Sequence, residues 1–275
     1  MSRLETGDIA HIRTSLAAYD ELFQRQTGKS MLAAAEWAYA KPVETQKLKA
    51  AVVPVTSGQG VISAFSESVC EILRFAGCRA WVTGGTDVGG LKEAYVKGAD
   101  IVFMADDDEY GAFGLTHRGY SSNGEATGTV FAAGLELMSH GIEGKEALVL
   151  GAGPVGRAAV AYLVRKKALV FAYDTDETRM NQLLREYPDV RADQNWQDHS
   201  FMHILDATPC KHILAAAQVT DRTLLALPGL PIGASKQVIG ACLSVLHNPL
   251  ELGTIAMLVQ CAPWGVAGEV TPEKE

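Results

Sequence analysis

The stretch ALVLGAGPVGRAAV, residues 147–160, decides the fold class of this chain. Its apolar run ALVL predicts a buried strand, and Gly151, Gly153 and Gly156 follow that run with the G-x-G-x-x-G spacing. A helix-forming segment begins directly after the loop, and Asp174 ends the next apolar run, about 20 residues further on. A strand, a glycine turn, a helix and a later acidic residue together predict a Rossmann dinucleotide-binding unit.

Each glycine in this loop has a separate expected task. Gly151 permits the tight turn, Gly153 lets the backbone approach a pyrophosphate, and Gly156 lets the helix pack closely on the strand. The helix start, with Pro154 and Val155 in its first turn, would face the diphosphate with free N–H groups and the positive end of its dipole. The alternative is a strand–turn–helix unit whose glycines serve packing only.

Asp174 favours NAD over NADP as the cofactor. A carboxylate at the end of the second strand can accept both ribose hydroxyls of NAD and would repel a 2′-phosphate. Arg179 is close enough in sequence to weaken this preference slightly.

Two later loops complete the predicted cofactor site. The segments DATPC (206–210) and LPGLPIGAS (227–235) each follow an apolar run. Ligands of open parallel sheets bind beyond the carboxyl ends of the strands, so both loops are expected beside the nicotinamide. A nucleophilic role for Cys210 lacks a recognisable partner, and a plain loop thiol is the favoured interpretation. The expected contacts are Thr208, Pro209, Cys210, Pro228 and Gly229.

The rest of the chain predicts a second α/β unit. Residues 6–40 have helical spacing, and residues 48–105 then alternate short apolar runs with helical segments in a βαβαβ order. A long helix is expected over residues 121–142. We therefore predict an α/β protein in which an N-terminal helical plus βαβ domain, residues 1–125, precedes a linking helix and a C-terminal Rossmann domain, residues 126–275.

Composition excludes several classes of function. The 275-residue chain is 48% hydrophobic and has a net charge of −8, which argues against nucleic-acid and anionic membrane surfaces. It shows no signal peptide, and its apolar runs are too short to span a bilayer. Five cysteines without C-x-x-C, and histidines without metal spacing, predict reduced thiols in a cytoplasm and no metal site.

The first unit contains a second glycine loop and an acidic turn. VPVTSGQG, residues 53–60, has the outline of a phosphate loop but lacks a third glycine and a basic residue, so Thr56 and Ser57 are expected to offer hydroxyls to a substrate. In MADDDEYGAFG an EF-hand loop is excluded because His117 stands where its glutamate belongs. Two interpretations of the acidic turn remain, a solvated turn or a grip by Asp106 on a cationic group.

Several strings together resemble a known family. VPVTSGQGVISAF, MADDDEYGAFG, LGAGPVG, YDTD, DATPC and PGLPIG, in this order over residues 52–258, resemble the pyrrolysine-biosynthesis dehydrogenases, the PylD family. The resemblance implies that NAD takes hydride from the carbon bearing the terminal amine of 3-methyl-D-ornithyl-Nε-L-lysine. The ornithyl α-amine then attacks this carbon, ammonia leaves and the pyrroline ring closes. A homodimer is implied as well.

The resemblance also assigns site residues. Asp106 becomes the catalytic carboxylate, and the implied substrate contacts are Leu4, Ser57, Phe65 and Asp106. The chain departs from the family pattern at Asn248, where a glutamate is expected. Two alternatives stay open: another NAD-dependent dehydrogenase of an amino acid or opine-like compound, and an NAD-binding sensor without catalysis. The proton acceptor is also open, between water and the second amine of the substrate.

Overall fold

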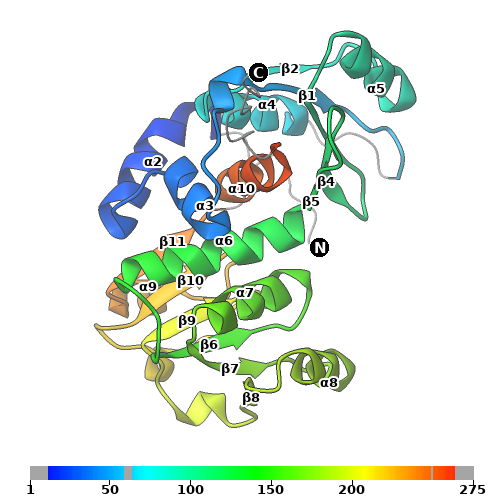
Figure 1. The fold of residues 1–275 in the computed structure, drawn as a ribbon. Helices are drawn as coiled ribbons and strands as arrows, with labels where there is room; N and C mark the ends of the chain where they lie inside the picture. Colours follow the sequence, from blue (N-terminus) through cyan, green and yellow to red (C-terminus); the bar gives the residue numbers. More distant parts are fainter. Residues whose placement is uncertain (1–11, 59–63, 249, 264–275) are drawn as a thin grey trace, which may run out of the picture.

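Two sheets joined by a long helix build the protein. The computed structural model describes residues 12–58, 64–248 and 250–263. Figure 1 shows the first sheet at one end of the molecule, the second at the other and helix α6 (Asn123–Met138) running between them. The predicted α/β fold with an N-terminal helical part, a linking helix and a Rossmann-type part is confirmed.

The first sheet has the strand order β2-β1-β3-β4-β5. Strands β1 (Lys49–Val53), β2 (Arg79–Val82) and β3 (Ile101–Ala105) are parallel, as the βαβαβ pattern predicts. Strands β4 (Tyr110–Gly114) and β5 (Tyr120–Ser122) extend the sheet antiparallel to β3. We did not predict this hairpin, because two glycines and a run of acidic residues give its sequence a low β-propensity.

Helices cover this sheet and lead to the second one. Among the described residues, the helices before α6 are α2 (Ile12–Thr27), α3 (Met31–Tyr39), α4 (Phe65–Phe75) and α5 (Asp87–Val96). Helix α4 gives way to β2 at Gly77, which has a φ of +90° that glycine adopts without strain. Helix α6 begins at a cap in which the Ser122 side chain accepts a hydrogen bond from the Glu125 N–H.

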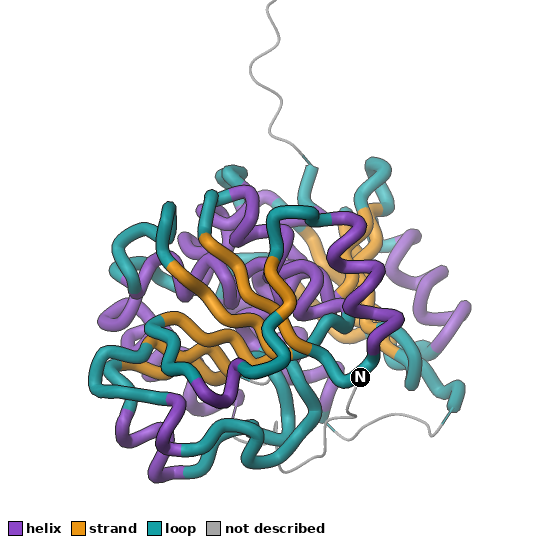
Figure 2. The backbone as a smooth tube through the Cα atoms, turned by 90° about the horizontal axis from the view of Figure 1, so that it is seen from below, coloured by secondary structure: helices purple, strands orange, loops and turns teal. Residues whose placement is uncertain are grey.

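The second sheet is parallel throughout, with the order β11-β10-β9-β6-β7-β8. Its strands are β6 (Glu146–Leu150), β7 (Leu169–Tyr173), β8 (Arg191–Ala192), β9 (His203–Asp206), β10 (Leu224–Leu227) and β11 (Ser244–His247). Three helices accompany it, namely α7 (Pro154–Arg165), α8 (Glu177–Glu186) and the short α9 (Lys236–Ala241). Short 3₁₀ turns cover Thr45–Lys47, Trp196–Asp198 and Ala216–Gln218. Of these, β8, α9 and the 3₁₀ turns were not predicted. Figure 2 shows the strands of a sheet side by side with helices around them.

The closing helix α10 (Glu251–Cys261) returns to the first sheet. It packs on α6, α3, α4 and the β4–β5 hairpin, and almost every residue in it is buried. Figure 1 places it above α6, on the side of the first sheet. The division of the chain into two domains at residue 125 stays a prediction. Helix α10 belongs to the second part by sequence but packs against the first part.

Helices α6 and α7 lie in very close contact. A Cβ atom at Gly128 would overlap the carbonyl oxygen of Val155, so glycine is needed at this crossing. The first turn of α7 is thereby held against the linking helix. Within the described residues, no helix is long and apolar enough to cross a membrane.

Candidate active site

The glycine loop between β6 and α7 has the geometry that its sequence predicts. Gly151 has a φ of +95°, in the region that favours glycine. A Cβ atom at Gly156 would overlap the Gly151 carbonyl oxygen, so helix and loop touch through bare backbone. At Gly153 a Cβ would meet no atom within 4 Å, so this residue faces open space at the start of α7. Close packing therefore explains why residue 156 is a glycine, but it does not explain why residue 153 is one.

The structure places Asp174 beside this loop. Its Oδ2 accepts a hydrogen bond from the Ala152 N–H at 2.6 Å, and its Oδ1 accepts one from the Asp176 N–H at 2.8 Å. The carboxylate is thus fixed at the end of β7, next to the glycine loop and half-buried. Each carboxylate oxygen keeps further acceptor capacity. The position suits the ribose contact that the sequence predicts.

Arg179 is occupied close to its own backbone. Its Nε lies 3.3 Å from Oδ2 of Asp176, one turn earlier on α8. Asp176 also caps α8, because its Oδ1 accepts hydrogen bonds from the N–H groups of Thr178 and Arg179. The guanidinium that could have favoured a 2′-phosphate is therefore engaged.

The loops after β9 and β10 meet the glycine loop. A Cβ at Gly151 would lie 3.1 Å from the carbonyl oxygen of Ala207 and 3.4 Å from Cγ2 of Thr208. A Cβ at Gly229 would lie 3.3 Å from the Thr208 carbonyl oxygen. Three of the predicted cofactor loops are thus brought together at one edge of the second sheet. Pro209 and Cys210 are exposed there, and Pro228 is buried.

Asp206 is a residue of this cluster that sequence reasoning did not select. It is 2% exposed, and its Oδ1 accepts hydrogen bonds from the N–H (3.0 Å) and the hydroxyl (2.7 Å) of Thr208. Burial raises the pKa of the Asp206 carboxyl, against the effect of the Thr208 hydrogen bonds. Its other oxygen packs on Gly233. The signal in the sequence was an acidic residue ending an apolar strand, the same signal that selected Asp174.

In the first sheet, Thr56 is tied to Asp87. The Thr56 N–H donates to Oδ1 of Asp87 at 2.9 Å and its hydroxyl donates to Oδ2 at 2.7 Å. Hydrogen bonds from Thr56 hold the pKa of Asp87 below its usual value. The role of Asp87 was not predicted, and Thr56 is occupied in positioning the loop. Ser57 is exposed beside it.

The Ser57 loop and the acidic turn lie at the same edge of the first sheet. Strands β1 and β3 are adjacent and parallel, with Val53 opposite Met104, so their carboxyl ends coincide. A Cβ at Gly58 would overlap the side chain of Asp107. The fold therefore brings together Ser57 and Asp106, two residues that stand far apart in the sequence.

Asp106 is an exposed carboxylate that also shapes its own turn. Its Oδ1 accepts hydrogen bonds from the N–H groups of Asp108 at 2.9 Å and Glu109 at 2.8 Å. These bonds hold the pKa of the Asp106 carboxyl below its usual value, so it is ionised at neutral pH. Oδ2 takes no part in these turn bonds. The two interpretations of this turn are compatible, because the carboxylate both closes the hairpin and presents charge.

Phe65 lies at the start of α4 against the hairpin. Its ring meets that of Tyr110 edge to face, with ring centroids 5.3 Å apart. The Tyr110 hydroxyl is in turn 3.0 Å from the Thr254 hydroxyl of α10. Phe65 is half-buried and thus keeps an accessible face. Leu4 lies outside the described residues.

Asn248 has a structural task in this chain. Its Oδ1 accepts a hydrogen bond from the Leu252 N–H at 3.0 Å, and its side chain is buried at the start of α10. The departure from the family pattern therefore supplies an acceptor for an N–H group in the first turn of α10. In the described part of the chain, no three His, Cys, Asp or Glu side chains are grouped as a metal site.

Known proteins similar to this chain cover almost its whole length. The sequence model of the family "Pyrrolysine biosynthesis protein PylD, N-terminal domain" matches residues 8–121. Pyrrolysine synthase of Methanosarcina barkeri is 31% identical over 261 residues, which are 94% of this chain and 97% of that protein. The chain belongs to the pyrrolysine synthase family. The pyrrolysine synthase of Methanosarcina acetivorans is similarly close, at 30% identity over 94% of this chain and 98% of that protein. The resemblance drawn from the sequence strings is confirmed.

Solved structures place this family member in a wider fold group. An Ael1 enzyme from Pseudomonas putida matches with a TM-score of 0.57 at 12% identity, over 80% of this chain and 93% of that one. Shikimate dehydrogenase from Aquifex aeolicus matches with a TM-score of 0.53 at 15% identity, over 81% and 97%. At such low identity these likenesses show the shared two-sheet fold.

Proposed function

We propose that this protein is an NAD-dependent dehydrogenase that catalyses the last step of pyrrolysine synthesis. Its substrate is 3-methyl-D-ornithyl-Nε-L-lysine, and its products are pyrrolysine, ammonia and reduced cofactor. The observation that carries the proposal is the alignment with two pyrrolysine synthases along 94% of the chain.

The residues around the second glycine loop fit a dinucleotide. Gly153 leaves open space at the start of α7, where backbone N–H groups and the helix dipole favour a diphosphate. Asp174 is fixed beside this space, and Arg179 is engaged by Asp176, which supports NAD as the cofactor and not NADP. When bound, NAD accepts the hydride released by the substrate carbon.

Asp106 acts on the amine that is oxidised. A primary amine with a pKa of about 10.4 is cationic at neutral pH, but only its neutral form releases hydride readily from the adjacent carbon. The ionised Asp106 attracts the cation and stabilises the iminium that develops. The same charge raises the pKa of the amine, so a separate acceptor, water or the second amine of the substrate, takes the proton.

Ser57 and Phe65 position the substrate around this carboxylate. The Ser57 hydroxyl lies at the same sheet edge, and the open face of Phe65 offers apolar contact to the methylene chain. Holding the ornithyl α-amine near the oxidised carbon favours ring closure, because the attack becomes intramolecular. The carbon–nitrogen bond to the terminal amine then breaks and ammonia leaves.

One incubation tests the proposal. The protein is mixed with NAD and the synthetic dipeptide, and NADH is followed by absorbance while the product is weighed by mass spectrometry. We expect NADH, ammonia and a product lighter than the substrate by ammonia and two hydrogens. Unchanged substrate with bound NAD would instead identify a cofactor-binding sensor. NADH formation with amino acids but not with the dipeptide would identify a different dehydrogenase.

Two further parts of the proposal concern the assembly and its compartment. We propose a homodimer, as the family resemblance implies, and a cytoplasmic location, which the five free thiols support. Light scattering of the purified protein and localisation of the tagged chain in its host test these two statements.

A further inference from the structure

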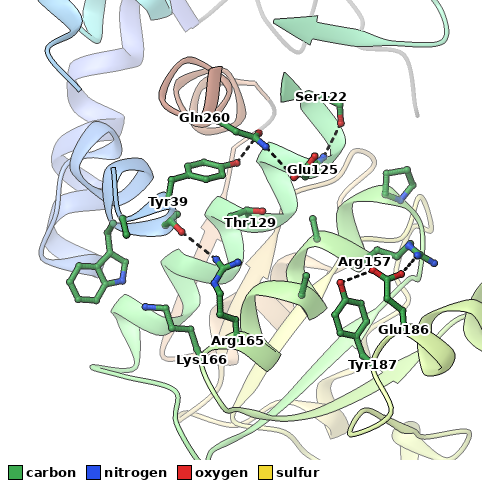
Figure 3. Close-up of a pocket in the computed structure, with 16 residues that line it drawn as sticks. Tyr39, Ser122, Glu125, Thr129, Arg157, Arg165, Lys166, Glu186, Tyr187 and Gln260 are labelled. Carbon is green, nitrogen blue, oxygen red and sulfur yellow. Dashed lines mark hydrogen bonds and ion pairs between the residues drawn. The ribbon is translucent and has the colours of Figure 1, made fainter. Parts of the chain in front are cut away.

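A cavity of about 910 Å³ lies away from the predicted substrate contacts. It is formed where α3, α6 and α10 meet α7 and the end of α8 (Figure 3). None of Ser57, Phe65 and Asp106 contributes to its walls. Its volume falls in the range of small-molecule sites, and the aromatic residues Trp37, Tyr39 and Tyr187 are among those that line it.

Most of the charges in this cavity are already paired. Arg157 forms an ion pair with Glu186, and Lys166 lies 3.2 Å from Glu136 of α6. Figure 3 shows the Arg157–Glu186 pair at the Tyr187 end of the cavity. These pairs neutralise two of the three cations that line the cavity.

Arg165 is the remaining cation. One of its nitrogens donates to the Ala38 carbonyl oxygen at a long 3.4 Å, and its guanidinium lies 5.1 Å from the centre of the Tyr162 ring. Within the described part of the chain it forms no ion pair, and its side chain is exposed to the cavity. A guanidinium has five donors arranged to suit a carboxylate, and most of the Arg165 donors are available.

Glu125 is the matching anion. Its Oε1 accepts a hydrogen bond from Nε2 of Gln260 at 3.0 Å, and no cation among the described residues pairs with it. The amide of Gln260 is itself oriented, because its oxygen accepts from Ser121 at 2.6 Å and from Tyr39 at 3.2 Å. The Glu125 carboxylate is therefore held in place by a neutral network, and its charge is available.

The Tyr39 hydroxyl is influenced by both charges. Burial raises its pKa, and of the two charges that act on it Glu125 raises the pKa and Arg165 lowers it. Both charges are thus close to one hydroxyl, which Figure 3 shows projecting between α6 and α10. Geometry links both charges to the end of α3, because Glu125 bonds to the Gln260 amide that Tyr39 also contacts, and Arg165 donates to the carbonyl of Ala38. An anion and a cation, neither with an ionic partner among the described residues, thus line one cavity, as the two charged groups of a zwitterion require.

We propose that this cavity binds a free α-amino acid, with its carboxylate on Arg165 and its ammonium on Glu125. The side chain of the ligand extends toward the Arg157–Glu186 pair and Tyr187. A long side chain ending in a polar or cationic group fits this end of the cavity, since Glu186 can accept a hydrogen bond there. The cavity includes Pro154 of the predicted cofactor loop but none of the predicted substrate contacts, and the proposal does not depend on the proposed reaction.

Calorimetric titration of the full chain with L-lysine tests the site. We expect saturable binding of L-lysine, and binding at least tenfold weaker for cadaverine, which lacks the carboxylate, and for 6-aminohexanoate, which lacks the α-amine. Arg165→Met and Glu125→Gln should each weaken L-lysine binding at least tenfold. Lys167→Gln removes a surface charge of the same helix end outside the cavity, and should leave binding unchanged.

Two controls locate the site and guard against misfolding. Asp106→Asn, in the substrate cleft, should leave L-lysine binding intact, and loss of binding in this variant alone would place the ligand in the cleft and overturn the proposal. Equal affinity for L-lysine and cadaverine, or no saturable binding, would overturn it too. If Arg165→Met melts early, Arg165→Lys, which keeps the charge, should retain binding that Glu125→Gln loses. The titration uses no cofactor and no turnover, so its failure is distinguishable from failure of the proposed function.

Discussion

The loop after β1 and the loop after β6 both leave a buried parallel strand through glycine, but different forces hold them. After β6 the helix begins at Pro154, and Gly156 touches Gly151 through bare backbone. After β1 the helix begins only at Phe65, and carboxylates of Asp87 and Asp107 contact the loop at Thr56 and Gly58. An anion is favoured at the N-terminus of α7, after β6. At the loop after β1 an anion is repelled by the carboxylates of Asp87 and Asp107. Similar glycine signals thus lead to different surroundings, which are the basis for proposing a phosphate site beside the second sheet and a cation site beside the first.

Neutralising Asp106, the carboxylate that follows β3 in the first sheet, should have the largest effect on turnover. Asp106→Asn keeps an oxygen for the N–H groups of Asp108 and Glu109 but loses the charge. We expect turnover of the dipeptide to fall about 100-fold or more, the usual cost of losing electrostatic stabilisation of a transition state. NAD affinity, measured by fluorescence titration, should not change. An Asp106→Asn variant that loses NAD binding but keeps turnover at saturating NAD would reverse the proposed roles of the two sheets, substrate binding at the first and cofactor binding at the second.

Substitution in the second loop separates packing from cofactor binding. Gly156→Ala forces a methyl group onto the Gly151 carbonyl oxygen, and we expect a loss of about 1–3 kcal/mol in the free energy of unfolding. Gly153→Ala is the matched control, since its φ of −71° suits alanine and no atom lies within 4 Å. The Gly153 variant should melt like the wild type and bind NAD more weakly. Unchanged NAD affinity in Gly153→Ala would favour the interpretation of this loop as packing alone.

Asp174→Ala should have a smaller effect on the same loop. Removal of the ribose acceptor should weaken NAD binding about tenfold, which corresponds to about 1.4 kcal/mol. The Ala152 N–H also loses its partner, so part of the loss reflects a looser loop. Asp174→Asn keeps one acceptor oxygen and should lie between the wild type and the alanine variant. A gain in NADP binding in either variant would support the repulsion of a 2′-phosphate by Asp174.

The smallest expected effect is a pH dependence confined to the second sheet. Burial lowers the pKa values of His203 and His247, both of which also contact backbone carbonyls. Their folded pKa values lie below the unfolded value, so their contribution to stability is present above the unfolded pKa and is lost as the pH falls through the folded pKa. Urea unfolding at pH 7.5 and pH 5 should therefore show a lower free energy of unfolding at pH 5. His203→Gln should reduce this difference, whereas the exposed His199→Gln should not.

Several elements were predictable because their signals are local. The alternation of apolar runs and helical segments predicts eight strands at their observed places, and the long helix before Gly151 is found as α6. The β4–β5 hairpin escaped prediction because its stability comes from pairing with β3 and from packing of Tyr110 beneath Phe65, not from its own residues. The apolar segment 250–262 predicts a closing helix, which is found as α10, but its position against the first sheet follows from contacts over more than a hundred residues.

The sequence by itself determined the parallel strands other than β8, the helices other than α9, the glycine loop after β6 and the acidic residue that follows β7, because spacing along the chain encodes backbone geometry. It also carried the family strings that the relatives confirm. Only the tertiary structure decided that Asp87 holds Thr56, that Asp206 is buried under Thr208, and that Arg165 and Glu125 share one cavity. Thr56 and Asp87 come from different elements, as do Arg165 and Glu125, and the burial of Asp206 likewise arises when helices and sheets pack. A side chain acquires its partners and its pKa from that packing, which no local pattern records.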